Sequence, residues 1–466
     1  MSHVAGCQFD SLPESTVEAT KCLMLDTLGA ILAAREVPDV LSLSRLVRGW
    51  GGNEATILGS ANRVTAHHAA LVNGTMARTL ELDVVHEKAI LHSSATILPV
   101  ALAAMELAGG ASGRELLTAV AIGIDLSARI SLAMIVDVGS SAAPTRTMSF
   151  TYQMGILVGA VVAARMMRMD VGAIRNVLGV AYSQCAGNQQ ALFEGVSTVR
   201  VQQGLSAMTA VLSAQLGKVG VTGAQHSLEG VAGYFQAFHQ GRLDRTAILD
   251  GLGTWFEVDN VSIKPFPCCK YTHTAIAAAL EARKYPEFDL ERVTAVVAHV
   301  NHREYYEIVC QPEDPTERRR QLAGPDGRVR AQFCLPYVVA AALRDGDVGL
   351  RHFTEPCRGD PGLLSLTDKV TTSIDAGAPG RSLPVPGILD IHLQDRPEPI
   401  RVEVANAKGH PDNRMTYQDV TRKFLRVSSL HPGANEQWRL GKIAAAVAGI
   451  ESESDARRLI RALAVS

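Results

Sequence analysis

The feature of the sequence that most constrains the fold is a break in pattern at residues 264–270, which read KPFPCCK. Upstream of this segment, apolar residues recur at the three-to-four spacing of one helix after another. Its two prolines cannot lie inside a helix, because proline lacks a backbone donor and clashes with the preceding turn. β-branched runs follow, and helical spacing returns from Thr416. The sequence therefore predicts a mainly α protein with a large all-helical bundle domain, residues 1–264 and 406–466, interrupted by a smaller inserted α+β domain, residues 265–405.

The helical region is expected to begin with a segment capped by Ser15 or Thr16. Further helices are expected around residues 65–80, 94–107, 113–134, 154–167 and 171–185. Alanine and glycine on many of their apolar faces allow close helix–helix approach. In the inserted region we expect strands at 293–300, 370–374, 388–393 and 401–405, the last two as a hairpin, with helices at 274–283 and 336–344. The helix at 336–344 is the one expected between the first strand and the others.

Composition excludes several classes of protein. Lysine and arginine number 45 against 47 acidic residues, and aromatic residues make up 5% of the chain, so neither duplex nor single-stranded nucleic acid is an expected partner. The longest clean apolar run, residues 154–164, is shorter than the roughly 20 residues of a membrane span, and the N-terminus does not resemble a secretory signal. The eight cysteines form no CxxC pair, which favours buried thiols over disulfides or a zinc site. We therefore expect a soluble cytoplasmic protein that binds no membrane.

One cluster of titratable residues lies between positions 81 and 92. Glu81, Asp83, His86 and His92 fall within twelve residues. Two carboxylates and two imidazoles can transfer protons near neutral pH when their surroundings separate their pKa values. The alternative is a helix end with ordinary solvated charges.

A second cluster comprises Lys264, Lys270 and His273. Rigid prolines hold the two lysines forward, and His273 opens the next helix, whose N-terminal backbone N–H groups favour anions. The cluster is thus a candidate carboxylate-binding corner, and the alternative is a domain linker with solvated lysines. Cys268 and Cys269 are expected to be buried rather than nucleophilic.

Other motifs carry less weight. The run of arginines at 318–320 is expected to form a solvated face. No phosphate-binding loop, dinucleotide-binding loop, nucleophile elbow or metal-ligand cluster occurs in the sequence, so no cofactor and no metal are expected.

With these segments in place, the chain resembles the MmgE/PrpD family, which includes 2-methylcitrate dehydratase, cis-aconitate decarboxylase and iminodisuccinate epimerase. The resemblance rests on six segments in order: KCLMLDTLGAILAA, ALVNGTMARTLELD, GVTGAQHSLEG, KPFPCCKYTHTAIAAALEA, AQFCLPYVVAAAL and KGHPDNRMTYQDVTRKF. It implies a helical domain built from both chain ends, an inserted α+β lid, a positively charged site between the two for polycarboxylates, and a homodimer.

The resemblance assigns roles to several positions. Lys264 matches the motif lysine that faces the substrate, and His92 matches the histidine of an H-P-[SG] element in which Ser93 replaces the proline. The family's acidic D-x-D-D-[ST] stretch appears here as residues 81–85, where Glu81 and Asp83 are the retained acids.

At two further elements the sequence departs from the family pattern. Ser149 stands where a catalytic histidine is expected, with the hydroxyl of Tyr152 nearby as a substitute. Val199 replaces a lysine, while the following Arg200 is kept. Losing a histidine that works near neutral pH removes an effect of about 100-fold or more, so 2-methylcitrate dehydration of the usual kind is not expected.

The sequence predicts a cofactor-independent lyase of the dehydratase type, which removes a proton next to a carboxylate and then eliminates a β-substituent from a small di- or tricarboxylate. His92 is the expected acid or base and Asp83 its orienting partner, while Lys264 and Arg200 hold carboxylates and stabilise developing negative charge. Epimerisation, decarboxylation and a non-catalytic anion-binding scaffold remain as alternatives.

Overall fold

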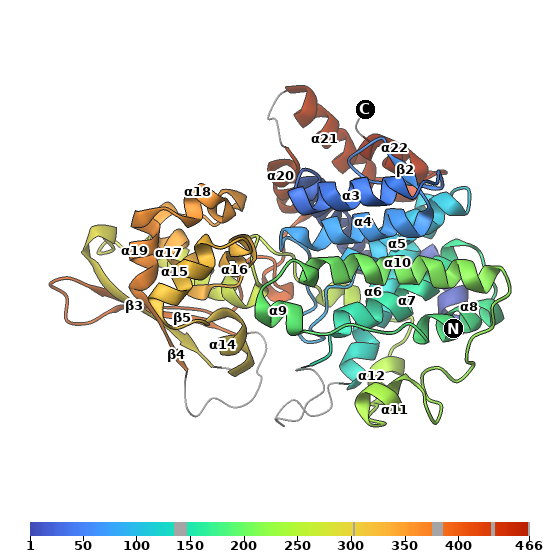
Figure 1. Cartoon of the computed structure of the whole chain (residues 1–466), viewed down its shortest axis with the longest axis horizontal. Helices are drawn as coiled ribbons and strands as arrows, with labels where there is room; N and C mark the ends of the chain where they lie inside the picture. The colour runs from blue at the N-terminus through green and yellow to red at the C-terminus, as the bar shows by residue number, and fades with distance from the viewer. Residues whose placement is uncertain (135–146, 302, 375–384, 430–433, 465–466) are drawn as a thin grey trace. The chain divides into compact units, whose positions relative to one another are not determined.

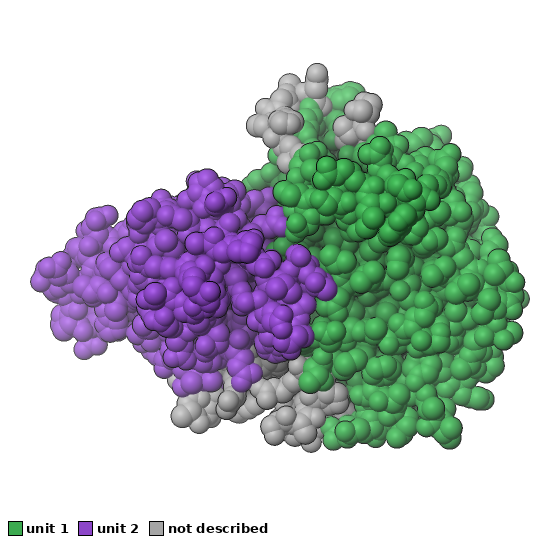
Figure 2. Space-filling model, viewed as in Figure 1, with its two compact units in different colours: residues 1–189, 200–263, 415–466 green, residues 190–199, 264–414 purple. Residues whose placement is uncertain are grey.

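The structure is a computed structural model in which residues 1–134, 147–301, 303–374, 385–429 and 434–464 are described. These residues form two compact units, coloured separately in Figure 2. Unit 1 comprises residues 1–189, 200–263 and 415–466, and unit 2 comprises residues 190–199 and 264–414. The division differs from the expected ranges in three respects: a short segment from the helical region, 190–199, belongs to unit 2, unit 2 begins at Lys264 rather than at residue 265, and it extends nine residues beyond 405.

Unit 1 is built almost entirely of helices (Figure 1). Both the N-terminal and the C-terminal helices of the chain belong to it. They are α1 (Ser2–Gly6), α2 (Glu14–Ala34), α3 (Pro38–Gly49), α4 (Ala66–Thr79), α5 (Ser94–Leu107), α6 (Gly113–Met134), α7 (Phe150–Met166), α8 (Val171–Tyr182), α10 (Thr198–Lys218, whose first two residues fall in unit 2), α11 (Tyr234–His239), α12 (Arg245–Leu249), α20 (Tyr417–Ser428), α21 (Ala434–Ala448) and α22 (Arg457–Leu463). The two chain ends meet where α2 packs on α20. Unit 1 also holds a two-stranded antiparallel sheet, β1 (Ala55–Thr56) with β2 (Arg63–Val64), so the prediction of an all-helical domain is wrong in this detail.

Most predicted helices are found close to their expected bounds. Helices α5 and α6 match the expected ranges, and α4 begins after Thr65 as expected. The predicted cap of the first long helix is wrong, because α2 begins at Glu14 after Pro13, which places Ser15 inside the helix. Helix α7 starts at Phe150, four residues earlier than expected, and α8 ends at Tyr182. The prediction missed α3 and α10.

Close packing of α4 and α10 rests on two glycines, as the small residues of the helical region led us to expect. A Cβ atom added to Gly204 in α10 would lie 2.2 Å from the Leu71 carbonyl oxygen in α4. A Cβ added to Gly74 in α4 would lie 3.1 Å from the Gly204 Cα atom. Because neither position has room for a side chain, the two backbones approach each other closely, and α10 reaches the loop that follows α4.

Helix α6 is long and apolar enough to cross a membrane, so the expectation that no segment fits one is wrong by length and composition. In the structure, however, 89% of its apolar window is buried. The helices α5, α7 and α12 pack around it within unit 1. Its burial is therefore that of a central core helix.

Unit 2 is organised around a four-stranded sheet in the order β4-β3-β5-β6. The strands are β3 (Val293–Val300), β4 (Val370–Ile374), β5 (Gly387–Leu393) and β6 (Ile400–Val404), which confirms the four predicted strands. Strand β3 pairs with β4 in parallel and with β5 in antiparallel register, and β5 and β6 form the predicted antiparallel pair. Alternate residues of β5 are buried, as expected for a sheet with one covered face.

Helices cover this sheet and extend unit 2. They are α9 (Gln190–Glu194), α13 (His273–Ala282), α14 (Arg303–Val309), α15 (Pro315–Ala323), α16 (Gly327–Gln332), α17 (Leu335–Asp345), α18 (Glu355–Arg358) and α19 (Pro361–Asp368). Helix α13 packs on β5 and β6, and α17 packs on α13 and β4. The prediction of a single helix between β3 and β4 is wrong, since α14 to α19 all lie there. Short polar helices such as α15 lack the apolar spacing that identifies longer ones.

Candidate active site

The first cluster predicted from the sequence lies on the loop that follows α4 and leads into α5. Two antiparallel bridges shape this loop: Val85 pairs with Ser262, and His86 pairs with Leu91. In the second bridge the His86 N–H donates to the Leu91 carbonyl at 2.8 Å, and the Leu91 N–H donates to the His86 carbonyl at 3.2 Å. The chain therefore turns back between residues 86 and 91.

This turn brings His92 against Asp83. Nδ1 of His92 lies 2.8 Å from Oδ2 of Asp83 and 3.0 Å from the carbonyl oxygen of Val84. Both neighbours are acceptors, so Nδ1 carries a proton, and the lone pair of the neutral ring is on Nε2. The side chain of Asp83 is 0% exposed and that of His92 is 18% exposed. A buried carboxylate at Nδ1 orients the ring and stabilises the imidazolium, which suits Nε2 for proton transfer.

The backbone of His92 is held by two other helices of unit 1. Its N–H donates to Oγ1 of Thr151, in the first turn of α7, at 3.2 Å. Its carbonyl oxygen accepts from Nε2 of Gln203 in α10 at 3.3 Å, and this amide also donates to Oγ1 of Thr96 in α5. The position of His92 is therefore set by α5, α7 and α10 together.

Arg78, in the last turn of α4, links the two acidic residues of the loop. Its Nη1 lies 2.5 Å from Oε1 of Glu81 and 3.0 Å from Oδ1 of Asp83. Burial alone would lower the pKa of Arg78, but the carboxylates of Asp83 and Glu81 raise it well above its ordinary value. One guanidinium thus faces two carboxylates, and a proton on His92 would balance the second negative charge. Glu81 adopts a left-handed backbone, with φ of 55°, which turns the chain directly after the helix.

The C-terminal segment of the chain supports the same loop. Nζ of Lys423, in α20, donates to the carbonyl oxygen of Leu82 at 3.0 Å and to Oδ1 of Asp26 at 2.6 Å. Lys423 and Asp26 are both buried. Because Leu82 lies between the two acidic residues, this contact ties their backbone to α2 and α20, the helices from the two chain ends.

Tyr152 is buried in the first turn of α7, close enough to Arg78, Glu81 and Asp83 for their charges to act on it. Burial raises the pKa of its hydroxyl far above the ordinary value; the two carboxylates reinforce the effect and Arg78 opposes it. The hydroxyl therefore keeps its proton and is suited to donate a hydrogen bond. Ser149 lies just before α7, where it is half-buried and its side chain does not cap the helix.

His86, also a candidate from the sequence, takes part in a different set of contacts. Its Nε2 lies 2.9 Å from Oε2 of Glu257, and its Nδ1 accepts the N–H of Ala89 at 3.1 Å. Nε2 therefore carries the ring proton and donates a hydrogen bond to the carboxylate of Glu257. Burial would raise the pKa of Glu257, but the hydrogen bonds from His86 and Asn260 hold it below its ordinary value. Both ring nitrogens of His86 thus serve to hold the loop.

The segment that carries Glu257 is fixed in turn by an ion pair in α6. The Glu257 N–H donates to Oδ1 of Asp125 at 2.8 Å, and Asp125 accepts from Nε of Arg129 at 2.9 Å. Arg129 also donates to the Trp255 carbonyl at 2.8 Å and lies over the Trp255 ring. All of this lies inside unit 1, so a buried polar chain extends from the core helix to the loop of His92.

The second cluster predicted from the sequence, Lys264, Lys270 and His273, belongs to unit 2. Arg200, which the family resemblance pointed to, is buried near the start of α10 in unit 1. Lys264 is fully buried, and Lys270 is half-buried in the turn that precedes α13. His273 begins α13, as predicted, and its Nε2 lies 3.2 Å from the Cys268 carbonyl oxygen. Cys268 and Cys269 are buried, as expected.

Within the described residues, no three histidine, cysteine, aspartate or glutamate side chains are grouped so that they could hold a metal ion. The titratable groups that unit 1 brings close to His92 are Asp83, Arg78 and Tyr152, and such a set can transfer protons.

Two family models match the chain one after the other, and the second extends beyond residue 414 into helices of unit 1. The N-terminal domain model of the MmgE/PrpD family matches residues 1–246, and the C-terminal domain model matches residues 266–448. The chain belongs to the MmgE/PrpD family.

Two relatives of this MmgE/PrpD chain carry names that refer to decarboxylases. A cis-aconitate decarboxylase-like protein of Aspergillus oryzae is 23% identical over 474 residues, covering 96% of this chain and 93% of the relative. The cis-aconitate decarboxylase of Aspergillus terreus is 24% identical over 383 residues, covering 78% of this chain and 75% of the relative.

Two positions at which the sequence departs from the MmgE/PrpD pattern can now be placed. Ser149 precedes the helix turn that carries Thr151 and Tyr152, so a hydroxyl replaces an imidazole one residue before α7. Val199 is 3% exposed and packs with Ala191 and Val329 in an apolar cluster of unit 2. The lysine expected there is therefore replaced by a residue that serves the packing of unit 2.

Sequence reasoning missed several residues of this MmgE/PrpD site. Arg78 was not singled out, although it stands three residues before Glu81 at a helix end, where an ion pair is expected. Thr151 and Glu257 had no such signal, because both lie far from the loop in sequence and reach it only through the fold.

Proposed function

We propose that this protein is a lyase that acts on a small di- or tricarboxylate, with His92 as the group that moves the proton. The observation that carries the proposal is the Asp83–His92 pair, in which the proton on Nδ1 leaves Nε2 as the basic atom. Membership of the MmgE/PrpD family and the names of its two relatives support this class of reaction.

In an elimination, Nε2 of His92 takes a proton from the carbon next to a carboxylate. The electron pair of that C–H bond forms the new double bond, and the β-substituent leaves with its own electron pair. Asp83 stabilises the resulting imidazolium, and Arg78 keeps Asp83 ionised and in place. In this proposal the hydroxyl of Tyr152, which retains its proton, donates a hydrogen bond to the departing oxygen.

In a decarboxylation, the bond to one carboxylate breaks, its electron pair passes to the substrate carbon, and the imidazolium of His92 supplies the proton that this carbon accepts. The names of the Aspergillus relatives favour this second candidate. In both reactions negative charge develops next to a carboxylate, and we propose that Lys264 and Arg200 supply the positive charge that stabilises it.

NMR in D₂O with citrate, cis-aconitate and imino-dicarboxylates as substrates tests the proposal. Decarboxylation incorporates one solvent deuterium into a product that has lost CO₂, whereas elimination yields an alkene and releases the substituent. Exchange of a carbon-bound proton without net product would identify an epimerase instead. Neither exchange nor turnover with any of these acids would contradict the proposal and favour a non-catalytic scaffold.

A further inference from the structure

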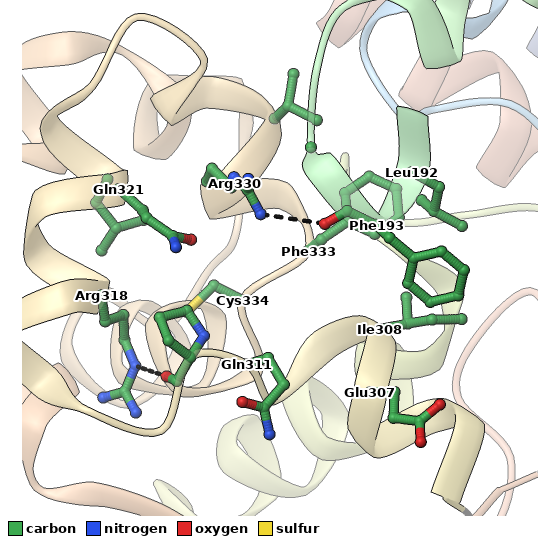
Figure 3. Close-up of a pocket in the computed structure, with 14 residues that line it drawn as sticks. Leu192, Phe193, Glu307, Ile308, Gln311, Arg318, Gln321, Arg330, Phe333 and Cys334 are labelled. Atoms are coloured by element: carbon green, nitrogen blue, oxygen red, sulfur yellow. Dashed lines mark hydrogen bonds between the residues drawn. The ribbon is translucent and has the colours of Figure 1, made fainter. Parts of the chain in front are cut away.

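Unit 2 contains a cavity that none of the proposed chemistry uses. Its volume is about 40 Å³, and its walls come from α9, α14, α15 and α16 (Figure 3). Phe193, Ile308 and Phe333 supply apolar surface, while Arg318, Gln321 and Arg330 supply polar groups. One water needs roughly 10–15 Å³ by this measure, so the cavity has room for about three waters or a solute of similar size.

Arg318 brings a buried positive charge to this cavity, although we expected a solvated run at 318–320. It is 6% exposed, whereas its neighbours Arg319 and Arg320 are exposed and paired with Asp368 and Glu317. Its Nε donates to the carbonyl oxygen of Pro312 at 3.3 Å (Figure 3). Its Nη2 donates to the carbonyl oxygen of Glu313 at 2.9 Å. Nη1 is buried without an acceptor, and no carboxylate among the described residues lies within 4.0 Å of the guanidinium.

Arg330, which is partly buried, approaches the same cavity from α16, and its hydrogen bonds within the described residues go to carbonyl oxygens. Its Nη1 lies 3.4 Å from the carbonyl oxygen of Phe193, and its Nη2 donates to that of Glu194. Glu317, whose pKa is lowered chiefly by Arg320 and only slightly by Arg330, is already held by Arg320 at 2.6 Å. Glu307 lines the opposite side of the cavity from Arg318 (Figure 3).

Two guanidinium groups therefore line one cavity, and neither forms an ion pair with a carboxylate in the described part of unit 2. For the buried Arg318 the lack of a counter-ion is unfavourable, because hydrogen bonds to carbonyl dipoles replace only part of the hydration of a cation. An anion held in the cavity would compensate both charges, and planar guanidinium groups suit the geometry of a carboxylate.

We propose that this cavity is a binding site for a small monocarboxylate of about the size of acetate. The volume admits roughly three or four non-hydrogen atoms, which matches acetate and is far too small for a tricarboxylate. The carboxylate faces Arg318 and Arg330, and the short apolar end faces Phe193 and Phe333. The proposal concerns unit 2 alone and does not depend on the function proposed above.

Thermal unfolding of the full chain in sodium acetate and in sodium chloride of equal ionic strength tests the proposal. Acetate is expected to raise the Tm of the wild type by about 2–4 °C relative to chloride, because a ligand that binds the folded state stabilises it. Arg318→Met and Arg330→Met are each expected to abolish this difference. The matched control Arg320→Met removes an exposed arginine of the same helix and is expected to retain it.

Saturation-transfer NMR on acetate with the same variants measures binding independently of stability. If Arg318→Met fails to fold, the loss of acetate binding in Arg330→Met is the test. An equal Tm in the two salts would overturn the proposal. It would also be overturned if Lys264→Ala abolished the acetate effect, since the anion would then bind elsewhere, or if phosphate gave a larger shift that depended on Arg318.

Discussion

Two buried arginines, one in each unit, show contrasting ways of placing a positive charge inside a protein. In unit 1, Arg78 is 5% exposed and faces the carboxylates of Glu81 and Asp83. In unit 2, Arg318 is 6% exposed, and its bonds to described residues go to carbonyl oxygens. Because the two side chains are equally buried, the difference lies in their partners. The charge of Arg78 is neutralised by carboxylates of the proton-transfer site, whereas the charge of Arg318 can still attract an anion.

The largest expected effect is on the rate of the reaction that we propose for His92 in unit 1, where Arg78 is paired with carboxylates. His92→Ala is expected to lower kcat/KM by about 10³–10⁴-fold, because it removes the group that carries the proton. Steady-state kinetics on the substrate identified by NMR measure the change. The control His226→Ala removes an exposed histidine of the same unit and should leave the rate unaltered. Equal activity of the two variants would exclude His92 as the acid or base.

The next effect concerns stability and contrasts the two arginines directly. Arg78→Met leaves two carboxylates buried without their cation, and we expect the free energy of unfolding to fall by about 3–5 kcal/mol. Arg318→Met removes a charge that has no counter-ion, so we expect a smaller loss, of about 1 kcal/mol, from the carbonyl bonds. Urea unfolding of both variants measures the difference. Losses of the same size would show that carboxylate pairing does not distinguish the two sites.

His239 extends the comparison to a buried group that is neutral in the folded protein at neutral pH. Burial lowers the pKa of His239 to about 4, and its Nε2 bonds to the hydroxyl of Tyr234 at 3.1 Å. The unfolded chain takes up a proton near pH 6.5 while the folded chain resists until about pH 4, so this contribution to stability is complete above pH 6.5 and is lost as the pH falls toward 4.

We therefore expect the wild type to lose about 2–3 kcal/mol more than His239→Gln between pH 7 and pH 4. Glutamine cannot take up the proton but can still donate to Tyr234. Unfolding free energies of the two proteins across this range provide the measurement, and parallel curves would show that His239 titrates normally in the folded state.

The smaller of the two expected effects on catalysis is that of Lys264→Met, a lowering of kcat/KM by about 100-fold, or about 2.7 kcal/mol of transition-state stabilisation. Methionine is the suitable replacement because Lys264 is fully buried and a similar volume preserves the packing. Kinetics together with the Tm separate the two roles: a loss of rate with an intact Tm supports carboxylate binding, whereas full activity would exclude Lys264 from the site.

Local spacing predicted much of this protein. Helices α5 and α6 and the four strands of unit 2 were found where apolar periodicity placed them, because that periodicity is a property of neighbouring residues. For the same reason Glu81, Asp83 and His92 could be recognised as one group, since all three lie on a single loop. The segment 190–199 was assigned to the wrong region, because its apolar residues Ala191 and Val199 find their partner Val329 more than a hundred residues away.

By itself, the sequence determined the family, the mainly α class, the strands of unit 2 and the residues available for proton transfer. Only the tertiary structure decided what each charge does. It turned His86 toward Glu257 and His92 toward Asp83, although both histidines lie on one loop, and it buried Arg318 while leaving Arg319 and Arg320 in solvent. The physical reason is that helix and strand formation depend on contacts within a few residues, whereas the burial and pairing of a charge depend on groups that the folded chain brings from elsewhere.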